Sequence, residues 1–159
     1  GCSGVKLEGG EAMAPTIRFL TERGIPVMAH VGLTPQAVNA LGGYGARGQS
    51  QEEHAKILAD AKAVTDAGAF SMVLEGVLEN LAQAVTQTVD IPVIGIGASA
   101  DCDGQVLVTD DMLGMFDRVP RFVKRYHEVA NEIVDAASQY AADVRSRSFP
   151  TQDQTYQPK

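Results

Sequence analysis

Val5-Lys6-Leu7-Glu8-Gly9-Gly10 is a short run of apolar and charged residues that breaks into two glycines. The run is typical of a strand that ends in a tight turn. Residues two apart on a strand point to the same side, so Lys6 and Glu8 leave the end of this strand on one face. A solvated edge strand can carry the same pair without any function. The pair therefore becomes informative only together with the strand ends further along the chain.

The same pattern, a short strand with a polar or glycine end, recurs along the chain. The expected strands are 5–8, 26–30, 70–75, 91–97 and 105–108. Apolar residues at spacings of three and four predict helices over 11–23, over 50–68, around 78–85 and over 122–133, with a short helical turn near 110–115. Ser50 and Glu53 predict a capping box at the start of the second helix. Residues 31–49 are glycine-rich and are expected to form a long loop with one helical turn from Thr34 to Ala40.

Strands that alternate with helices predict an α/β fold with a parallel sheet. A (β/α)8 barrel and an open doubly wound sheet both satisfy this pattern, and chain length distinguishes them. Barrels have about 250 residues, so five strand-helix units in 159 residues correspond to strands 4 to 8 of a TIM barrel. We expect residues 1–145 to form the C-terminal part of one barrel domain and 146–159 to be a disordered polar tail. The start of the chain on a strand, without a methionine, predicts part of a longer protein.

Composition excludes several classes of partner. The formal net charge is −7 and the basic residues are dispersed, which argues against nucleic acid and against an anionic membrane surface. No apolar run approaches the length of about 20 residues that spans a bilayer, so a cytoplasmic protein with a small-molecule ligand is expected. The cysteines, Cys2 and Cys102, fit neither a metal motif nor a disulfide framework.

The polar strand ends predict a site. Catalytic groups of a barrel lie at the carboxyl ends of its strands, which here carry Lys6, Glu8, His30 and Glu75. Ring closure would bring these four groups around one mouth, under the loop 31–49. They suit removal of a proton next to a carbonyl, because one carboxylate can help to bind a divalent cation and a second can accept the proton. The residues therefore favour enolate chemistry.

Each of these features has a plainer interpretation. His30 can equally be a core histidine with its hydrogen bonds satisfied, and His54 and His127 are assigned to the surface or to packing within helices. Residues 95–100 match the GxGxxA form of the dinucleotide fingerprint, but residues 101–104 (Asp-Cys-Asp-Gly) come next instead of an amphipathic helix. Without that helix the fingerprint is weak.

Several motifs in order resemble the ketopantoate hydroxymethyltransferase family. They are VKLEGG at 5–10, HVGLTPQ at 30–36, GGY at 42–44, LEG at 74–76, PVIGIGA at 92–98 and DGQVLV at 103–108. The resemblance covers nearly the whole chain.

The resemblance implies a (β/α)8 barrel that makes ketopantoate for pantothenate and coenzyme A synthesis. It implies condensation of 3-methyl-2-oxobutanoate with the one-carbon unit of 5,10-methylenetetrahydrofolate, with Mg²⁺ bound. Carried over by position, Lys6 contacts the keto acid, Glu8 lies at the magnesium and Glu75 accepts the proton. His30 lies in the substrate pocket, hydrogen-bonded to the keto acid. The resemblance also suggests a large homo-oligomer, a decamer.

Two departures from the family pattern matter, and one of them is Ser99, which stands where a glycine is common. The family's aspartate–serine pair and a further metal-binding aspartate would precede residue 1, so most of the metal site is not in this sequence. Two rival hypotheses therefore stay open beside the transferase. One is a Mg²⁺-dependent lyase of 2-oxo or 2-hydroxy acids on the same barrel, and the other is a non-catalytic fragment that needs the missing part.

Overall fold

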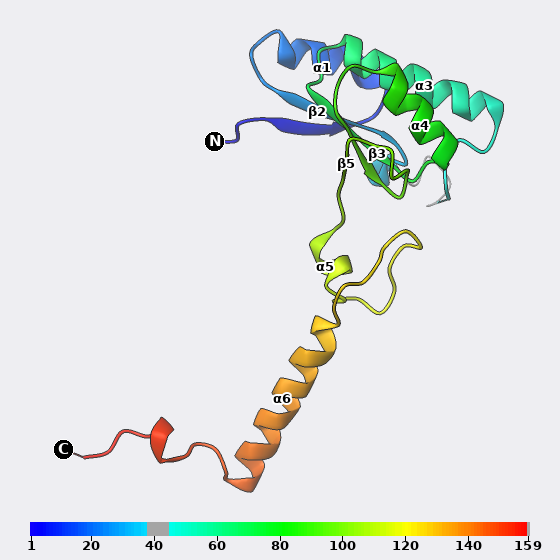
Figure 1. Cartoon of the computed structure of the whole chain (residues 1–159). Helices are drawn as coiled ribbons and strands as arrows, with labels where there is room; N and C mark the ends of the chain where they lie inside the picture. Colours follow the sequence, from blue (N-terminus) through cyan, green and yellow to red (C-terminus); the bar gives the residue numbers. More distant parts are fainter. Residues whose placement is uncertain (38–44, 159) are drawn as a thin grey trace. The chain divides into compact units, whose positions relative to one another are not determined.

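The computed structural model describes residues 1–37 and 45–158 (Figure 1). The chain divides into two compact units, Gly1–Val106 and Leu107–Lys159. The first unit holds the sheet and the polar strand ends, so it contains the candidate site. Each unit is described by itself.

The first unit is built on one five-stranded parallel sheet. Its strands are β1 (Val5–Glu8), β2 (Val27–Gly32), β3 (Ser71–Glu75), β4 (Val93–Ile96) and β5 (Gly104–Gln105). The strands lie in the order in which they occur along the chain. A doubly wound sheet reverses its strand order at a switch point, and this sheet, over the residues described, has no such reversal. The predicted α/β fold with a parallel sheet is confirmed, and a partial barrel is consistent with this strand order.

Helices connect β1 to β2, β2 to β3 and β3 to β4, and they lie along one side of the sheet (Figure 1). They are η1 (Glu11–Met13), which continues into α1 (Ala14–Thr21), then α3 (Gln51–Asp66) and α4 (Glu79–Thr88). A short 3-10 helix, η2 (Pro35–Ala37), comes after β2. The predicted helical turn from Thr34 to Ala40 falls only partly within the described residues, as does the loop 31–49.

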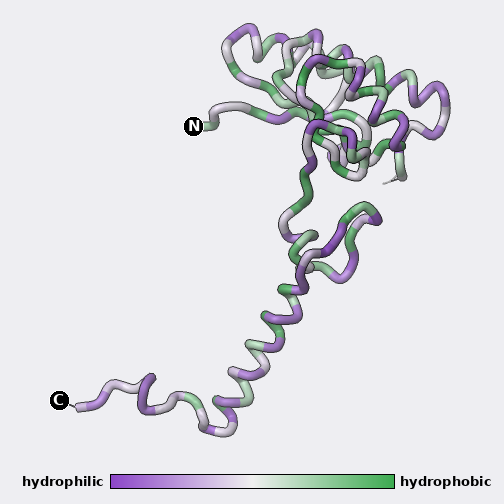
Figure 2. Tube along the Cα trace, viewed as in Figure 1, coloured by the Kyte–Doolittle hydropathy of each residue, from purple (hydrophilic) through white to green (hydrophobic). Residues whose placement is uncertain are grey.

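Alternation along β2 separates a core face from a site face. Val27, Ala29 and Val31 are buried in the apolar cluster that includes residues of the helices. Figure 2 shows hydrophobic stretches, in green, alternating with hydrophilic ones along this unit. Met28 and His30 point to the opposite side, because neighbouring residues of a strand face opposite ways. His30 is only 2% exposed although it is polar. The sheet therefore fixes an imidazole on the face that the helices of this unit do not cover.

Three details of the first unit differ from the sequence prediction. β2 continues two residues beyond His30, and β5 ends at Gln105 rather than at 108 because the last ladder bond there joins the Val106 N–H to the Gly95 carbonyl. Ser50 caps α3 by accepting from the Glu53 N–H, as predicted. The Glu53 carboxylate, however, accepts from residues before Ser50, so only half of the expected capping box is present.

The second unit contains α5 (Thr109–Met112), α6 (Val129–Ser146) and η3 (Gln152–Gln154). The prediction of a helix that begins near Phe122 is wrong. The N–H groups of Tyr126 and Val129 donate to the carbonyls of Met112 and Leu113, so the chain before α6 is used to pair with α5. A short 3-10 helix lies in the polar tail, and the predicted domain boundary near residue 145 stays a prediction.

None of the helices that the structure describes is long and apolar enough to cross a membrane. Cys2 and Cys102 are both free thiols, the first exposed and the second buried.

Candidate active site

The register of the sheet brings the polar strand ends together. Glu8 lies opposite His30 in the ladder between β1 and β2, and Gly32 lies opposite Glu75 in the ladder between β2 and β3. His30 is opposite Val73, and Val73 and Glu75 are two apart on one strand. Glu8, His30 and Glu75 therefore share one face at the carboxyl edge of the sheet.

The side chains confirm that these groups meet. The two ring nitrogens of His30 point to different partners: Nε2 lies 3.1 Å from Oε2 of Glu75, and Nδ1 lies 3.3 Å from Nζ of Lys6. Oε1 of Glu8 is 3.6 Å from the same Nδ1 and 3.9 Å from the Lys6 ammonium. The imidazole thus lies between two carboxylates and beside one ammonium. The sequence prediction that Lys6, Glu8, His30 and Glu75 converge is confirmed as geometry.

The partners of His30 indicate its tautomer. The Lys6 ammonium can only donate, so a hydrogen bond between these two groups makes Nδ1 the acceptor and places the proton of a neutral ring on Nε2. Although Oε2 of Glu75 is 3.1 Å away, it lies off the direction of that N–H, and Nε2 has no hydrogen-bond partner among the described residues. A buried polar group without a partner is costly. The Nε2–H of His30 therefore lies beside the Glu75 carboxylate without an aligned acceptor among the described residues, which argues against a core histidine whose hydrogen bonds are all satisfied.

Glu8 is held from the segment after β2. Its Oε2 accepts from the backbone N–H of Gln36 in η2, at 3.0 Å, and its side chain is 11% exposed. Glu8 presents hard oxygen atoms, which Mg²⁺ prefers, and Mg²⁺ is commonly bound through one or two carboxylates together with waters and substrate. The described residues contain no cluster of three or more His, Cys, Asp or Glu side chains placed to hold a metal. Glu8 therefore fits as one ligand of such an ion and does not make a metal centre by itself.

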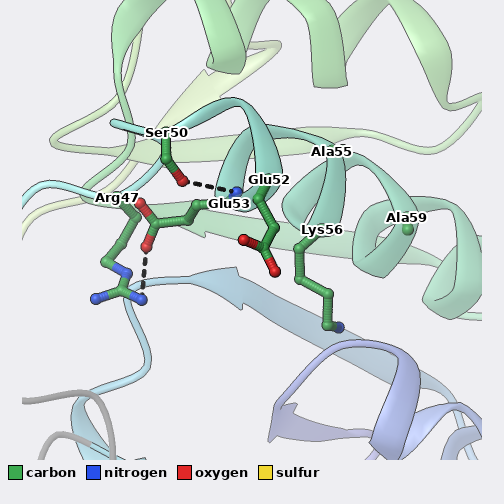
Figure 3. A pocket seen from close by; sticks show the side chains of 7 residues that line it. All are labelled: Arg47, Ser50, Glu52, Glu53, Ala55, Lys56 and Ala59. Carbon is green, nitrogen blue, oxygen red and sulfur yellow. Dashed lines mark hydrogen bonds and ion pairs between the residues drawn. The ribbon is translucent and has the colours of Figure 1, made fainter.

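Arg47 and Glu53 form an ion pair that the sequence did not predict. The guanidinium of Arg47 contacts Glu53 at 2.6 Å, and both side chains are 24% exposed (Figure 3). They line an open hollow of about 760 Å³ on α3, together with Ser50, Glu52, Ala55, Lys56 and Ala59. The capping signal at Ser50 predicted where α3 begins, but no spacing rule pairs a loop arginine with a helix glutamate.

Comparisons with known proteins identify a family for this chain. A family model described as ketopantoate hydroxymethyltransferase matches residues 1–152. This match takes in almost the whole chain, including every strand of the sheet. The chain belongs to the ketopantoate hydroxymethyltransferase family.

Curated relatives agree with this membership. A 3-methyl-2-oxobutanoate hydroxymethyltransferase of Novosphingobium aromaticivorans is 68% identical over 159 residues, which are 100% of this chain and 55% of that protein. The protein of the same name from Sphingopyxis alaskensis is 67% identical over 98% of the chain and 54% of its own length. A 3-methyl-2-oxobutanoate hydroxymethyltransferase 2 of Zymomonas mobilis is 57% identical over 100% of the chain and 58% of its own length. The chain thus spans a little over half the length of these ketopantoate hydroxymethyltransferases.

The sequence also contains two glycine motifs. The GGY motif at 42–44 lies outside the described residues. The glycine motif at 95–100 leads into a turn in which the Cys102 N–H donates to the Ser99 carbonyl, and no helix begins there. The motif therefore lacks the helix N-terminus that binds a pyrophosphate in dinucleotide sites.

Proposed function

We propose that the protein to which this chain belongs transfers a hydroxymethyl group from 5,10-methylenetetrahydrofolate to 3-methyl-2-oxobutanoate, giving 2-dehydropantoate. Family membership and the names of relatives up to 68% identical support this activity. The single structural observation that supports it most is the buried Nε2–H of His30, which has no partner among the described residues and points beside the Glu75 carboxylate. A keto acid offers both an oxygen for that donor and an acidic C–H for that carboxylate.

Lys6 and His30 bind the keto acid, and Glu75 accepts its proton. The Lys6 ammonium, whose side chain is 48% exposed, attracts the carboxylate of the keto acid. The Nε2–H of His30 donates to an oxygen of the bound keto acid and so holds the keto acid beside the Glu75 carboxylate. Glu75, whose side chain is 14% exposed, accepts the proton from C3, next to the carbonyl. The enolate carbon then forms a C–C bond to the methylene carbon of 5,10-methylenetetrahydrofolate. The two C–N bonds of that carbon break, water supplies the hydroxyl oxygen of 2-dehydropantoate, and tetrahydrofolate leaves.

Glu8 would be a ligand of Mg²⁺. When bound, the ion polarises the carbonyl oxygen and stabilises negative charge there. Glu8 is already oriented for this role by the Gln36 N–H and by the nearby Lys6 ammonium. The relatives are longer than this chain, and we propose that the remaining ligands come from the part of the protein that the chain does not cover.

The strand order and the family also suggest an assembly. We propose that β1 to β5 are strands 4 to 8 of a (β/α)8 barrel, so that the face carrying His30 lines the barrel interior. We propose that this barrel is part of a cytoplasmic homo-oligomer that makes ketopantoate for pantothenate synthesis. Analytical ultracentrifugation of the protein expressed with any residues encoded upstream of Gly1 measures its oligomeric state.

A transfer assay tests the function. The protein, expressed with any residues encoded upstream of Gly1, is incubated with 3-methyl-2-oxobutanoate, Mg²⁺ and 5,10-methylenetetrahydrofolate, and the product is measured by NMR. Formation of 2-dehydropantoate only when the folate is present is the expected result. Turnover of the keto acid without a one-carbon donor would instead indicate a lyase. Titrating Mg²⁺ and keto acid into the 159-residue chain alone then measures whether this part binds them by itself.

A further inference from the structure

The loop before α3 returns to the carboxyl end of β3. The backbone N–H of Arg47 donates to the carbonyl of Gly76 at 2.8 Å, and the N–H of Leu78 donates to the carbonyl of Arg47 at 3.1 Å. Arg47 thus pairs with Val77 as one isolated parallel bridge. Gly76 comes directly after Glu75, so this bridge holds the first peptide groups after the proposed proton acceptor.

Glu53 ties three consecutive residues of that loop to α3. Its Oε1 lies 2.6 Å from Nη2 of Arg47, while its Oε2 accepts from the N–H groups of Gly48 at 2.7 Å and Gln49 at 3.1 Å. Figure 3 shows the Glu53 carboxylate turned toward Arg47, with Ser50 at the start of the helix. Charge-assisted bonds of this kind are stronger than neutral ones. α3 itself is anchored in the core by Ile57, Ala61 and Val64.

A plainer role for Glu53 would be to start the helix. A glutamate at this position of a capping box accepts from the N–H of the capping residue, which is Ser50 here. Glu53 instead reaches past Ser50 to the two residues before it. A carboxylate that served only the helix start would not need Arg47.

The segment is also closely packed at Gly48. Gly48 is buried and has a φ of +87°, and a Cβ placed on it would lie 2.4 Å from Cδ2 of Leu81 on α4. Leu81 is fully buried. The loop therefore lies between the Glu53 carboxylate and α4.

Backbone contacts with the neighbouring strands hold Glu75 and the N–H of Gly76. The N–H of Leu33 donates to the Glu75 carbonyl at 2.8 Å, and the N–H of Gly76 donates to the Ile96 carbonyl at 2.9 Å. Gly76 then turns the chain with a φ of +59°. Beyond this turn the chain is joined to Arg47, so the direction in which β3 ends depends on where Arg47 is held.

We propose that Arg47 and Glu53 are positioning residues for Glu75. This inference rests on the proposed role of Glu75 as proton acceptor. The carboxylate of Glu53 holds Arg47 by its side chain, Arg47 holds Gly76 and Leu78 by its backbone, and Glu75 is thereby kept beside Nε2 of His30. Neither residue touches the keto acid in this arrangement.

Matched variants test the proposal in the protein expressed with any residues encoded upstream of Gly1. Glu53→Gln removes the charge that binds Arg47, and Arg47→Gln removes the other half. Glu52→Gln changes the net charge equally at an exposed neighbour, and Ser50→Ala weakens the start of α3 without touching Arg47. Two readouts are needed: kcat and KM for the keto acid, and hydrogen exchange of the Arg47 and Leu78 amides.

The expected result is specific to the ion pair. A misplacement of about 1 Å can cost about 100-fold in rate, so Glu53→Gln and Arg47→Gln lower kcat by about 10- to 100-fold with little change in KM. The Arg47 and Leu78 amides then exchange about 10-fold faster. Glu52→Gln and Ser50→Ala leave kcat and both amides close to wild type, although Ser50→Ala lowers the melting temperature.

The outcomes separate this inference from the proposed function. If Glu53→Gln keeps the wild-type kcat and exchange rates, or if Ser50→Ala lowers kcat as much, positioning by the ion pair is refuted. If the wild-type protein shows no transferase activity but the two amides still respond to Glu53→Gln alone, the proposed function is refuted while the structural link stands.

Discussion

Replacement of Gly32 by alanine perturbs the site through the backbone alone. Gly32 is the last residue of β2 and has a φ of +90°, which alanine adopts at a cost of about 1 kcal/mol. A Cβ placed there would lie 2.5 Å from the carbonyl oxygen of Glu75, about 0.9 Å inside the 3.4 Å at which ordinary contact begins. The obstacle is backbone and cannot rotate away, so the end of β3 must move.

The size of both effects can be worked out from this shift. Overpacking costs about 1–3 kcal/mol, and with the backbone term we expect Gly32→Ala to lower the free energy of unfolding by about 3 kcal/mol. A displacement of Glu75 near 1 Å lowers proton abstraction by about 100-fold. Urea unfolding measures the first effect and deuterium uptake by 3-methyl-2-oxobutanoate measures the second. Gly24→Ala is the control, because Gly24 also has a positive φ, +78°, but nothing lies within 4 Å of its Cβ position.

Wild-type stability together with wild-type deuterium uptake in Gly32→Ala would refute a steric link between Gly32 and Glu75. The link is also refuted if Gly24→Ala slows the uptake by the same factor, since the effect would then not depend on contact with Glu75.

Two further predictions concern the β1 side of the site. A Cβ on Gly10 would meet the Asp60 side chain, which accepts from the Glu11 N–H at 2.7 Å. Gly10→Ala therefore lowers the free energy of unfolding by about 1–3 kcal/mol, as measured by urea unfolding. Adding Asp60→Ala should recover part of the loss. Lys6→Met keeps the length of the side chain but removes the ammonium beside His30, and we expect KM for the keto acid to rise about 10-fold or more with a smaller change in kcat, since a hydrogen bond to a charged group contributes about 1.5–3 kcal/mol. Steady-state kinetics at fixed Mg²⁺ measure both constants, and an unchanged KM would place Lys6 outside the binding site.

Much of the fold could be predicted from local patterns. Short apolar runs that end in a polar residue or glycine located the first four strands, whereas the fifth overlaps its prediction only at Gln105. The shared face of Lys6 and Glu8 came from the two-residue period of a strand. Convergence of Glu8, His30 and Glu75 came from parallel strands having their carboxyl ends at one edge. These features are predictable because strand periodicity and parallel register are local or nearly local properties.

The remaining features depend on contacts between distant residues. The expected helix start at Phe122 is wrong because the Tyr126 N–H bonds to a carbonyl 14 residues earlier, at Met112, which periodicity cannot indicate. The pairing of Arg47 with Gly76 and Leu78 likewise joins segments about 30 residues apart. The missing acceptor of the His30 Nε2–H is a property of the packed site and has no sequence signal.

Exchange of the C3 proton of 3-methyl-2-oxobutanoate for solvent deuterium, measured by NMR with Mg²⁺ but without folate, shows whether Glu75 is the base. Glu75→Gln keeps the shape of the side chain and removes the base, so we predict that exchange falls by at least about 100-fold while keto acid binding, measured by calorimetry, changes little. Glu79→Gln, at an exposed carboxylate on the first turn of α4, should exchange like the wild type. Exchange at the wild-type rate in Glu75→Gln would show that the carboxylate beside His30 is not the base.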